Sequence, residues 1–216
     1  MNKKTLVAAV AAVICSVAVC ADGFFDGKPL YAKLALGYEM RSVDVPYLSP
    51  VASSYEDYAT FSDSMSFFKL KPSVGMVLFP EHDNFFLKGL AVEVGLDFGF
   101  GGADYDYVGY GTDTSAVTII PGARAVWNAM IPEARFIPHA FVGFEIPISI
   151  VSSEVTGVSG LSDAGWRETT GGFDIDVGVG VTFNVTEKIG VLADFTGFFG
   201  TSNGFSFTVG ASYRFK

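Results

Sequence analysis

Hydrophobic and polar residues alternate through most of the chain after its N-terminal region. From Phe173 to Phe183, for example, every second residue is apolar, and the residues between are Asp, Gly or Thr. A period of two places successive side chains on opposite faces of a β-strand. We therefore predict eight strands. They span Leu30–Arg41, Phe67–Phe79, Gly89–Gly101, Val117–Asn128, His139–Val151, Gly172–Val185, Ile189–Phe199 and Phe205–Phe215.

These segments belong to a chain that is unusually apolar. Half of the residues are hydrophobic and the mean hydropathy is +0.39, which favours contact with a membrane. None of the eight segments has the roughly eighteen uninterrupted apolar residues of a membrane helix. In lipid, a closed sheet is the only arrangement of strands that pairs every backbone N–H and C=O. The sequence therefore predicts an all-β fold, an eight-stranded antiparallel up-and-down transmembrane β-barrel.

Charged residues within the segments all fall on one face. The apolar faces contain none, whereas the opposite faces contain thirteen: Lys33, Glu39, Arg41, Lys69, Lys71, Glu93, Asp97, Arg124, Glu145, Asp174, Asp176, Asp194 and Arg214. The interior of an eight-stranded barrel is too narrow for the many Leu, Ile, Val and Phe residues. We therefore expect the apolar faces to contact outer-membrane lipid and the charged faces to line the lumen. The same volume argument excludes a soluble barrel of the lipocalin kind.

The connections between the segments alternate in length. We expect periplasmic turns at Pro80–Lys88, Ala129–Pro138 and Thr186–Lys188, because such turns are short in outer-membrane barrels. The outward loops are then Ser42–Ser66, Gly102–Ala116, Ser152–Gly171 and Gly200–Gly204. With this topology the outward aromatic residues fall at the two membrane interfaces. Pro72 and Pro121 lie inside predicted strands and lack an N–H, so we expect local bulges there.

The N-terminus has the pattern of an export signal. Lysines precede an apolar run from Leu6 to Val19, and the small residue Ala21 suits a signal peptidase. We expect residues 1–21 to be removed, leaving residues 22–216 as one barrel domain that reaches the bacterial outer membrane through the general secretory pathway. A retained membrane helix and a lipoprotein cut before Cys20 are alternatives. Both cysteines lie in the signal, so the mature chain needs no disulfide.

The export signal, the eight alternating segments and the final GASYRFK together resemble the small outer-membrane barrels grouped around OmpX and the transmembrane domain of OmpA. The resemblance covers nearly all of the mature chain. It implies that the outer-membrane insertion machinery recognises the last strand, where Tyr213 and Phe215 match the family pattern and Lys216 is an addition. The usual sequence features of OmpW are not evident, so its transport of hydrophobic molecules carries over only weakly. A narrow OmpW-like channel for small solutes or hydrophobic molecules is the alternative function.

The thirteen charged residues of the lumen comprise six basic and seven acidic side chains. Paired with one another, they would form a salt-bridge network that fills the interior. A narrow ion path lined by rings of charge is the alternative.

The predicted outward loops are acidic and rich in aromatic residues. A solvated, repulsive rim would explain the acids alone. The aromatic residues favour a contact surface, because such side chains supply binding area. The candidates are Tyr47, Tyr55, Tyr58, Tyr105, Tyr107, Tyr110 and Trp166. We expect a structural, adhesion or other surface-interaction role toward a host or envelope ligand.

Other function classes find little support. The net charge of −9 argues against nucleic acid. Asp104 and Asp106 weakly resemble a calcium loop, but Ser115 stands where that loop needs Glu, so we predict no metal site and no cofactor. His82 and His139 are both placed on the periplasmic side, away from the outer leaflet where lipid-modifying barrels act, so we predict no enzymatic activity.

Overall fold

The computed structural model describes residues 29–48, 58–107, 110–129, 134–156 and 165–215. They form ten strands and one short helix. The strands are β1 (Leu30–Leu48), β2 (Tyr58–Val77), β3 (Leu90–Tyr107), β4 (Tyr110–Asn128), β5 (Phe136–Glu145), β6 (Ile148–Thr156), β7 (Gly165–Gly171), β8 (Asp174–Asn184), β9 (Ile189–Gly200) and β10 (Gly204–Arg214). The helix is α2 (Phe85–Lys88). In the part of the chain described, no helix has the length and apolar character to cross a membrane.

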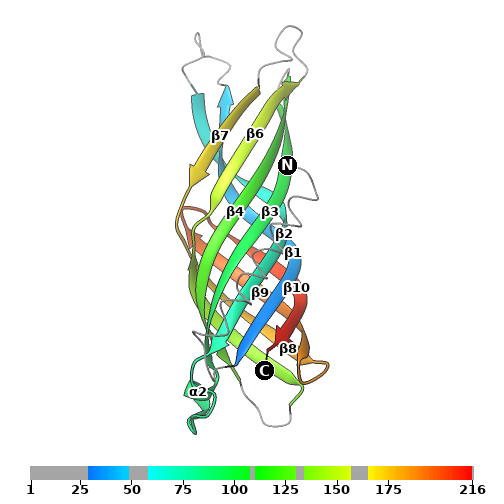
Figure 1. The fold of residues 1–216 in the computed structure, drawn as a ribbon. Coiled ribbons are helices and arrows are strands. Elements are labelled where there is room, and N and C mark those ends of the chain that lie inside the picture. Colours follow the sequence, from blue (N-terminus) through cyan, green and yellow to red (C-terminus); the bar gives the residue numbers. More distant parts are fainter. Residues whose placement is uncertain (1–28, 49–57, 108–109, 130–133, 157–164, 216) are drawn as a thin grey trace.

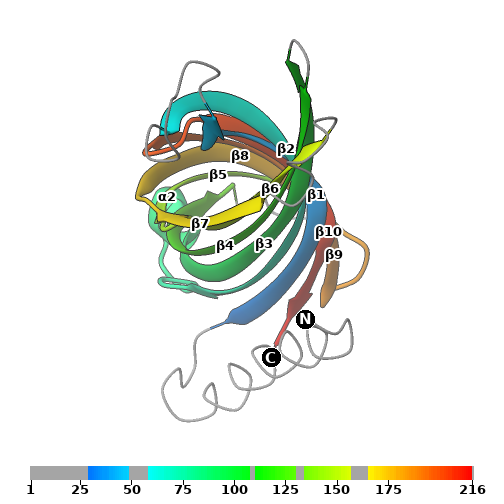
Figure 2. The same ribbon diagram turned by 90° about the horizontal axis from the view of Figure 1, so that it is seen from above.

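The ten strands make an eight-stranded antiparallel barrel (Figures 1 and 2). β5 and β6 both pair with β4 in one continuous register, so they are two halves of a single barrel strand. β7 and β8 are likewise two halves of the next barrel strand, because they pair in one register with β6 and β5. Pairing of β3 with β4 closes the sheet. The predicted fold class is confirmed.

The predicted bulges at the prolines are wrong. The register of β1 with β2 runs without an inserted residue past Pro72, and that of β3 with β4 runs likewise past Pro121. Instead, the barrel strands are interrupted at Ile146–Pro147 and at Gly172–Phe173. Pro147 cannot donate to the ladder, but its carbonyl accepts from the N–H of Gly172 at 2.9 Å. A proline can thus break a strand without shifting its register.

Three of the predicted outward loops are shorter than expected, because the strands continue beyond the barrel as three paired ribbons, of which β3–β4 and β6–β7 are joined by the pairing of β4 with β6. β1 and β2 stay paired up to Leu48 and Tyr58, and β3 and β4 up to Tyr107 and Tyr110. β6 and β7 form a third ribbon within the predicted loop Ser152–Gly171. The residues that continue the outward face into these ribbons, such as Asp104, Asp113 and Glu154, are polar, so the alternation of the barrel strands does not extend to the ribbon ends. The ribbons lie at one end of the barrel, and α2 lies at the opposite end, called here the turn end (Figure 1).

Side chains are sorted as the alternation predicts. On β8, Val177 and Val179 are 42% and 60% exposed, whereas Asp174 and Asp176 are fully buried inside the barrel. On β9, where the alternation is weaker, Leu192 and Phe198 lie on the buried face. The exposed wall is therefore apolar, and the interior contains charged residues together with a few large apolar ones.

Candidate functional site: the ion-pair network of the lumen

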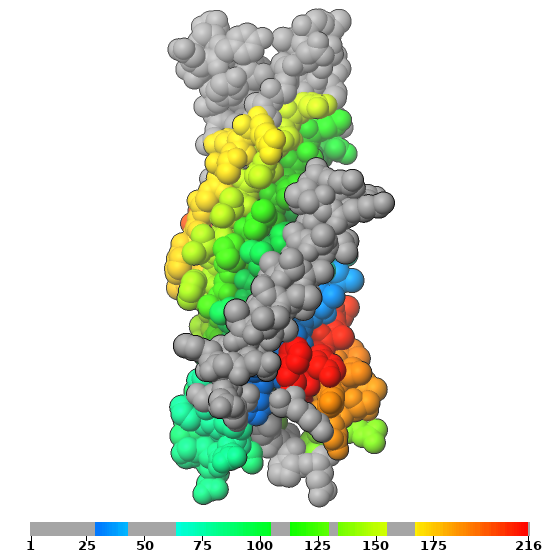
Figure 3. Space-filling view, in the orientation of Figure 1, coloured from blue at the N-terminus to red at the C-terminus, as the bar shows by residue number. Residues whose placement is uncertain are grey.

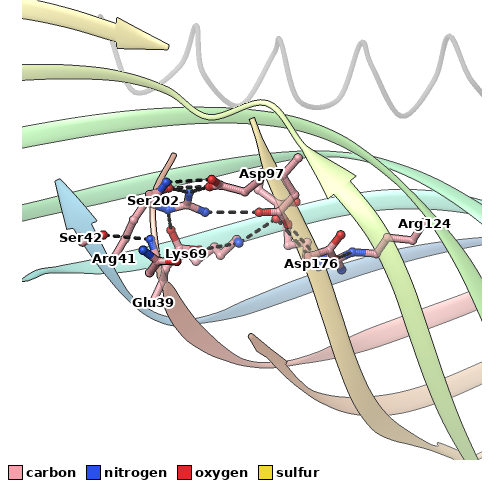
Figure 4. A network of polar contacts seen from close by, with 12 residues as sticks. Glu39, Arg41, Ser42, Lys69, Asp97, Arg124, Asp176 and Ser202 are labelled. Atoms are coloured by element: carbon pink, nitrogen blue, oxygen red, sulfur yellow. Dashed lines mark hydrogen bonds and ion pairs between the residues drawn. The ribbon is translucent and has the colours of Figure 1, made fainter. Parts of the chain in front are cut away.

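Arg41 is the centre of a buried polar network inside the barrel (Figure 4). Its Nε lies 2.7 Å from Glu39 Oε1, and its Nη1 lies 2.5 Å from Asp174 Oδ2. Nη1 also donates to Ser202 Oγ at 2.5 Å, and Nη2 lies 3.3 Å from Glu145 Oε2. The planar guanidinium can satisfy several acceptors at once because its donors point in fixed directions.

The Arg41 side chain also packs against an aromatic ring. The guanidinium carbon lies 4.0 Å from the ring centroid of Phe198, which is an attractive cation–π distance. The short turn between β9 and β10 adds a further contact, because the N–H and Oγ of Ser202 donate to the carboxylate of Asp174 at 2.9 and 2.5 Å. The network is therefore held by several strands and one turn.

Lys69 links two acidic groups in the middle of the network. Its Nζ lies 2.6 Å from Glu39 Oε2 and 3.0 Å from Asp97 Oδ2. The more exposed Lys71 is 3.9 Å from the same Asp97 oxygen, which is a looser contact. Both lysines are on β2, two residues apart, so they point to the same side of the strand.

Arg124 of β4 extends the network along the barrel. Its Nη2 lies 2.7 Å from Glu145 Oε1, and its Nε forms an ion pair with Asp176. The guanidinium carbon stands 4.7 Å from the ring centroid of Phe141. Because Glu145 contacts both Arg124 and Arg41, the two arginine centres form one connected network.

The thirteen charged residues that the sequence assigns to the lumen are not all joined. Nine belong to the connected network: Glu39, Arg41, Lys69, Lys71, Asp97, Arg124, Glu145, Asp174 and Asp176. Lys33 and Glu93 form a separate ion pair at 2.5 Å.

The other two charged residues pair with partners that the charge pattern did not indicate. Asp194 Oδ1 lies 2.7 Å from His139 Nε2, and Arg214 Nη2 donates to Asn184 Oδ1 at 2.9 Å. The parity of His139 on its strand places it on the lumen face, as the structure confirms, but only the register across β5, β8 and β9 brings it to Asp194.

Two apolar clusters lie on either side of the network. The cluster toward the ribbons contains Met65, Phe67, Ala116 and Val151, with Ala103 packed against it. The cluster toward the turn end contains Tyr31, Ala91, Val126 and Phe141, with Val77 packed against it. These inward residues are not charged, so the charge pattern gave no sign of them. The charged layer is thus covered at both ends by apolar side chains.

Between the lysines and arginines the lumen contains a small cavity. It has a volume of about 20 Å³ and is lined by Lys71, Glu93, Asp97, Arg124 and Glu145, among others. This volume is enough for about one water molecule. A hydrated ion is larger than this cavity. In the described part of the chain, no group of three or more His, Cys, Asp or Glu residues is arranged to hold a metal ion.

The ribbons present a second candidate surface. Asp104, Asp113 and Glu154 are exposed and stand directly opposite one another on β3, β4 and β6. Like charges in such cross-strand positions repel each other. A surface that keeps this unfavourable row is acidic in one defined place, not merely in its overall composition.

The sheet that carries this row ends in an open edge. Among the described strands, β7 pairs with β6 alone. On the other side of β7, β9 ends at Gly200, opposite Asp174 at the start of β8, and therefore does not reach β7. Arg167, Glu168 and Thr169 of β7 are all exposed. Within the described part of the chain, no strand lies beside the backbone groups on this side of β7.

The aromatic contact candidates can be placed only in part. Tyr55 lies outside the described residues. The other six lie on ribbon strands, where the backbone but not the side chain is described: Tyr47, Tyr58, Tyr105, Tyr107, Tyr110 and Trp166. The register sets Tyr107 opposite Tyr110, at the end of the β3–β4 ribbon. The candidates are thus distributed over all three ribbons.

The fold is similar to those of solved outer-membrane proteins. The chain is similar to a major outer-membrane protein from Thermus thermophilus, with 12% identity and a TM-score of 0.50 over 87% of this chain and 99% of that one. It is also similar to the outer-membrane protein OprG from Pseudomonas aeruginosa, with 9% identity and a TM-score of 0.50 over 87% and 96% of the two chains. The fold is that of a small bacterial outer-membrane β-barrel. This agrees with the predicted resemblance and with the apolar wall.

The sequence itself gives no closer relationship. No protein-family model matches the chain, and no curated protein matches its sequence significantly. At 9–12% identity the two structures share the fold with this chain, and a shared fold does not imply a shared function.

Proposed function

We propose that this chain is an outer-membrane protein with a closed lumen, which acts by binding a partner at the ribbons outside the membrane. The observation that carries the proposal is the acidic row of Asp104, Asp113 and Glu154 on a sheet whose last strand, β7, has a free edge. Basic side chains of a partner would suit the acidic row, and an extended segment of the same partner could add to the edge of β7.

The lumen supports the first half of this proposal. Removing one member of a buried ion pair costs about 3–5 kcal/mol, because the other charge is left without a partner. Separating several pairs at once to admit an ion would cost considerably more. The apolar clusters at both ends add a further barrier, since an ion would lose its hydration there. A steady channel for small solutes therefore needs a different arrangement of the interior.

The ribbons support the second half. Free strand edges tend to pair with other chains, and proteins commonly protect them with charged residues. Arg167 and Glu168 stand on β7 in such positions. These two charged side chains limit pairing of β7 with the β7 strand of a second copy of this chain, while the backbone groups of the edge stay accessible. We place this surface outside the cell, where adhesion to a host or envelope ligand takes place.

The remaining assignments belong to the same proposal. Residues 1–21 would direct export, and residues 22–216 would form the barrel, although residues 1–28 lie outside the described part of the chain. The outer-membrane insertion machinery would recognise the last strand, β10. We propose no catalytic role, because His139 is buried against Asp194 inside the barrel and His82 lies in the turn beside α2.

Neutralising the acidic row tests the interaction. The variant D104N/D113N/E154Q should bind host cells, matrix proteins and serum proteins less than the original protein does. The matched control is E81Q/D83N/E187Q, which removes the same number of exposed acids at the turn end. Binding by the original protein should also weaken as salt is raised, because exposed charges are screened. Equal binding by both variants would contradict the proposed surface.

Planar-bilayer recordings test the lumen separately. The purified protein should show no steady open channels. Reproducible openings would contradict a closed lumen and favour a narrow path for small solutes.

A further inference from the structure

The turn that joins β2 to β3 contains a short, capped helix rather than a simple loop. The side chain of Asn84 accepts from the N–H groups of Phe86 and Leu87 at 2.9 and 3.3 Å, which caps the start of α2. The Nδ1 of His82 accepts from the N–H of Asn84 at 3.0 Å. These local hydrogen bonds fix the direction in which the next side chains point.

This segment is attached to the outer wall of the barrel. The carbonyl of Gly89, directly after α2, accepts from the N–H and the Nδ2 of Asn128 at 2.8 and 3.1 Å. The rings of Phe85 and Phe86 lie 5.6 and 5.7 Å from the ring of Trp127, which faces outward from β4. α2 therefore continues the apolar wall beyond the end of the strands.

Much of the apolar surface of α2 nevertheless remains uncovered. Phe85, Phe86 and Leu87 are 43%, 67% and 38% exposed. The turn residues Glu81, His82 and Asp83, by contrast, are polar and precede the cap. The residues around α2 project from the lower end of the molecule (Figure 3). A fixed, projecting group of large apolar side chains is costly in water and typical of a contact surface.

Other aromatic pairs mark the same end of the barrel. The rings of Phe136 and Phe183 lie 4.8 Å apart, and those of Tyr213 and Phe215 lie 5.2 Å apart, both at strand ends. Aromatic residues gather at the level of the lipid headgroups in membrane barrels. α2 thus begins at the level where the lipid surface ends.

We propose that α2 is a membrane-interface anchor, with Phe85, Phe86 and Leu87 inserted at the boundary between headgroups and acyl chains of the periplasmic leaflet. The occupant is lipid, because the apolar surface of α2 is continuous through Trp127 with the wall that lipid already covers. Lys88, the last residue of α2, suits the phosphates of the headgroups. This inference needs only that the barrel spans a membrane, and it is independent of the partner proposed for the ribbons.

Fluorescence quenching at two positions tests the anchor. Bimane is attached to a single cysteine in the variant F86C or H82C, with Cys15 and Cys20 changed to Ser, and the full chain is reconstituted in phosphatidylcholine vesicles. Both positions are exposed, but H82C removes the ring that accepts from the N–H of Asn84, and F86C removes a ring contact with Trp127. The heat-modifiable gel shift of each labelled protein therefore has to show that the barrel is folded. The label at position 86 should be quenched by doxyl lipids and protected from aqueous iodide. The label at position 82 should show the reverse.

The outcomes separate lipid from other occupants. Equal iodide quenching at both positions would overturn the proposal, and would point instead to a periplasmic protein missing from the vesicles. Protection at position 86 that disappears at a low ratio of protein to lipid would also overturn it, because the cover would then be a second copy. A variant F85S/F86S should keep the heat-modifiable gel shift of a folded barrel and should expose Trp127 to iodide more than the original protein does.

Discussion

Arg41 offers the sharpest test of the ion-pair network. In the variant R41M the methionine can occupy much of the same space, but Asp174 loses its only ion-pair partner among the described residues, and Glu39 and Glu145 each lose one. Glu39 keeps Lys69, and Glu145 keeps Arg124. The main cost is therefore one uncompensated carboxylate, about 3–5 kcal/mol in the free energy of unfolding.

The matched control is K71M. Lys71 also contributes one positive charge to the lumen, but its Nζ is 3.9 Å from Asp97, and Asp97 keeps Lys69 at 3.0 Å. We expect K71M to cost clearly less than R41M, because it leaves no carboxylate without an ion-pair partner. Urea unfolding in lipid vesicles, followed by tryptophan fluorescence and by the heat-modifiable gel shift, measures both values.

The single variant D174N and the double variant R41M/D174N complete the cycle. Removing the charge left by R41M should recover part of the lost stability, giving a coupling energy of about 1–3 kcal/mol between positions 41 and 174. Two results would show that Arg41 does not hold the carboxylates in place, and would contradict a closed lumen. One is a loss in the free energy of unfolding for R41M no larger than that for K71M, and the other is additivity of the substitutions at positions 41 and 174.

Two further variants test the packing of the lumen and of the ribbons. In G180A the new methyl group would meet Asp194 Oδ1 and His139 Nε2, so the free energy of unfolding should fall by about 1–3 kcal/mol in urea titrations. G197A is its control, because only ordinary contacts with Phe199 await the methyl group there, and equal losses would show that the pair of His139 and Asp194 is not crowded. In D113N the repulsion by Asp104 and Glu154 is relieved. The free energy of opening of the β3–β4 ribbon should therefore rise by about 0.2–1 kcal/mol, and its amide hydrogens should exchange more slowly. Unchanged or faster exchange would mean that the three acids do not repel one another.

The sequence alone was enough to predict how the side chains of the barrel are sorted. Alternation with a period of two depends only on the extended backbone, so Val177 and Asp176 are assigned to opposite faces before any partner is known. Even on β9, where the alternation is weaker, Phe198 obeys the parity of its strand.

The partners within the lumen could not be predicted in the same way. Arg41 and Asp174 are on strands that are not neighbours in the sheet, and they meet only across the interior. Which charges meet there depends on the stagger of all the strands around the barrel. The role of Ser202 could not be predicted either, because serine is common in short turns and its contacts with Arg41 and Asp174 form only when the turn folds over the lumen.

The ends of the molecule were predicted least well, for physical reasons. The alternation exists because one face of a strand contacts lipid, and the ribbons beyond the barrel have no such face, so their extent was underestimated. α2 has only four residues, too few to show a helical period. The strand break at Pro147 was missed because a lone proline is compatible with a bulge, an edge or a gap.

The central claim is that the wall of this barrel faces lipid while its interior is closed. Nitroxide labels at the neighbouring positions Val209 and Thr208 of β10 test it most directly, because Val209 is 48% exposed and Thr208 is 2% exposed. In lipid vesicles the label at position 209 should collide freely with oxygen but not with a water-soluble nickel complex, and the label at position 208 should collide with neither. Strong collisions with the nickel complex at position 208 would show an open, water-filled lumen, and the same result at position 209 would show that the wall is not covered by lipid.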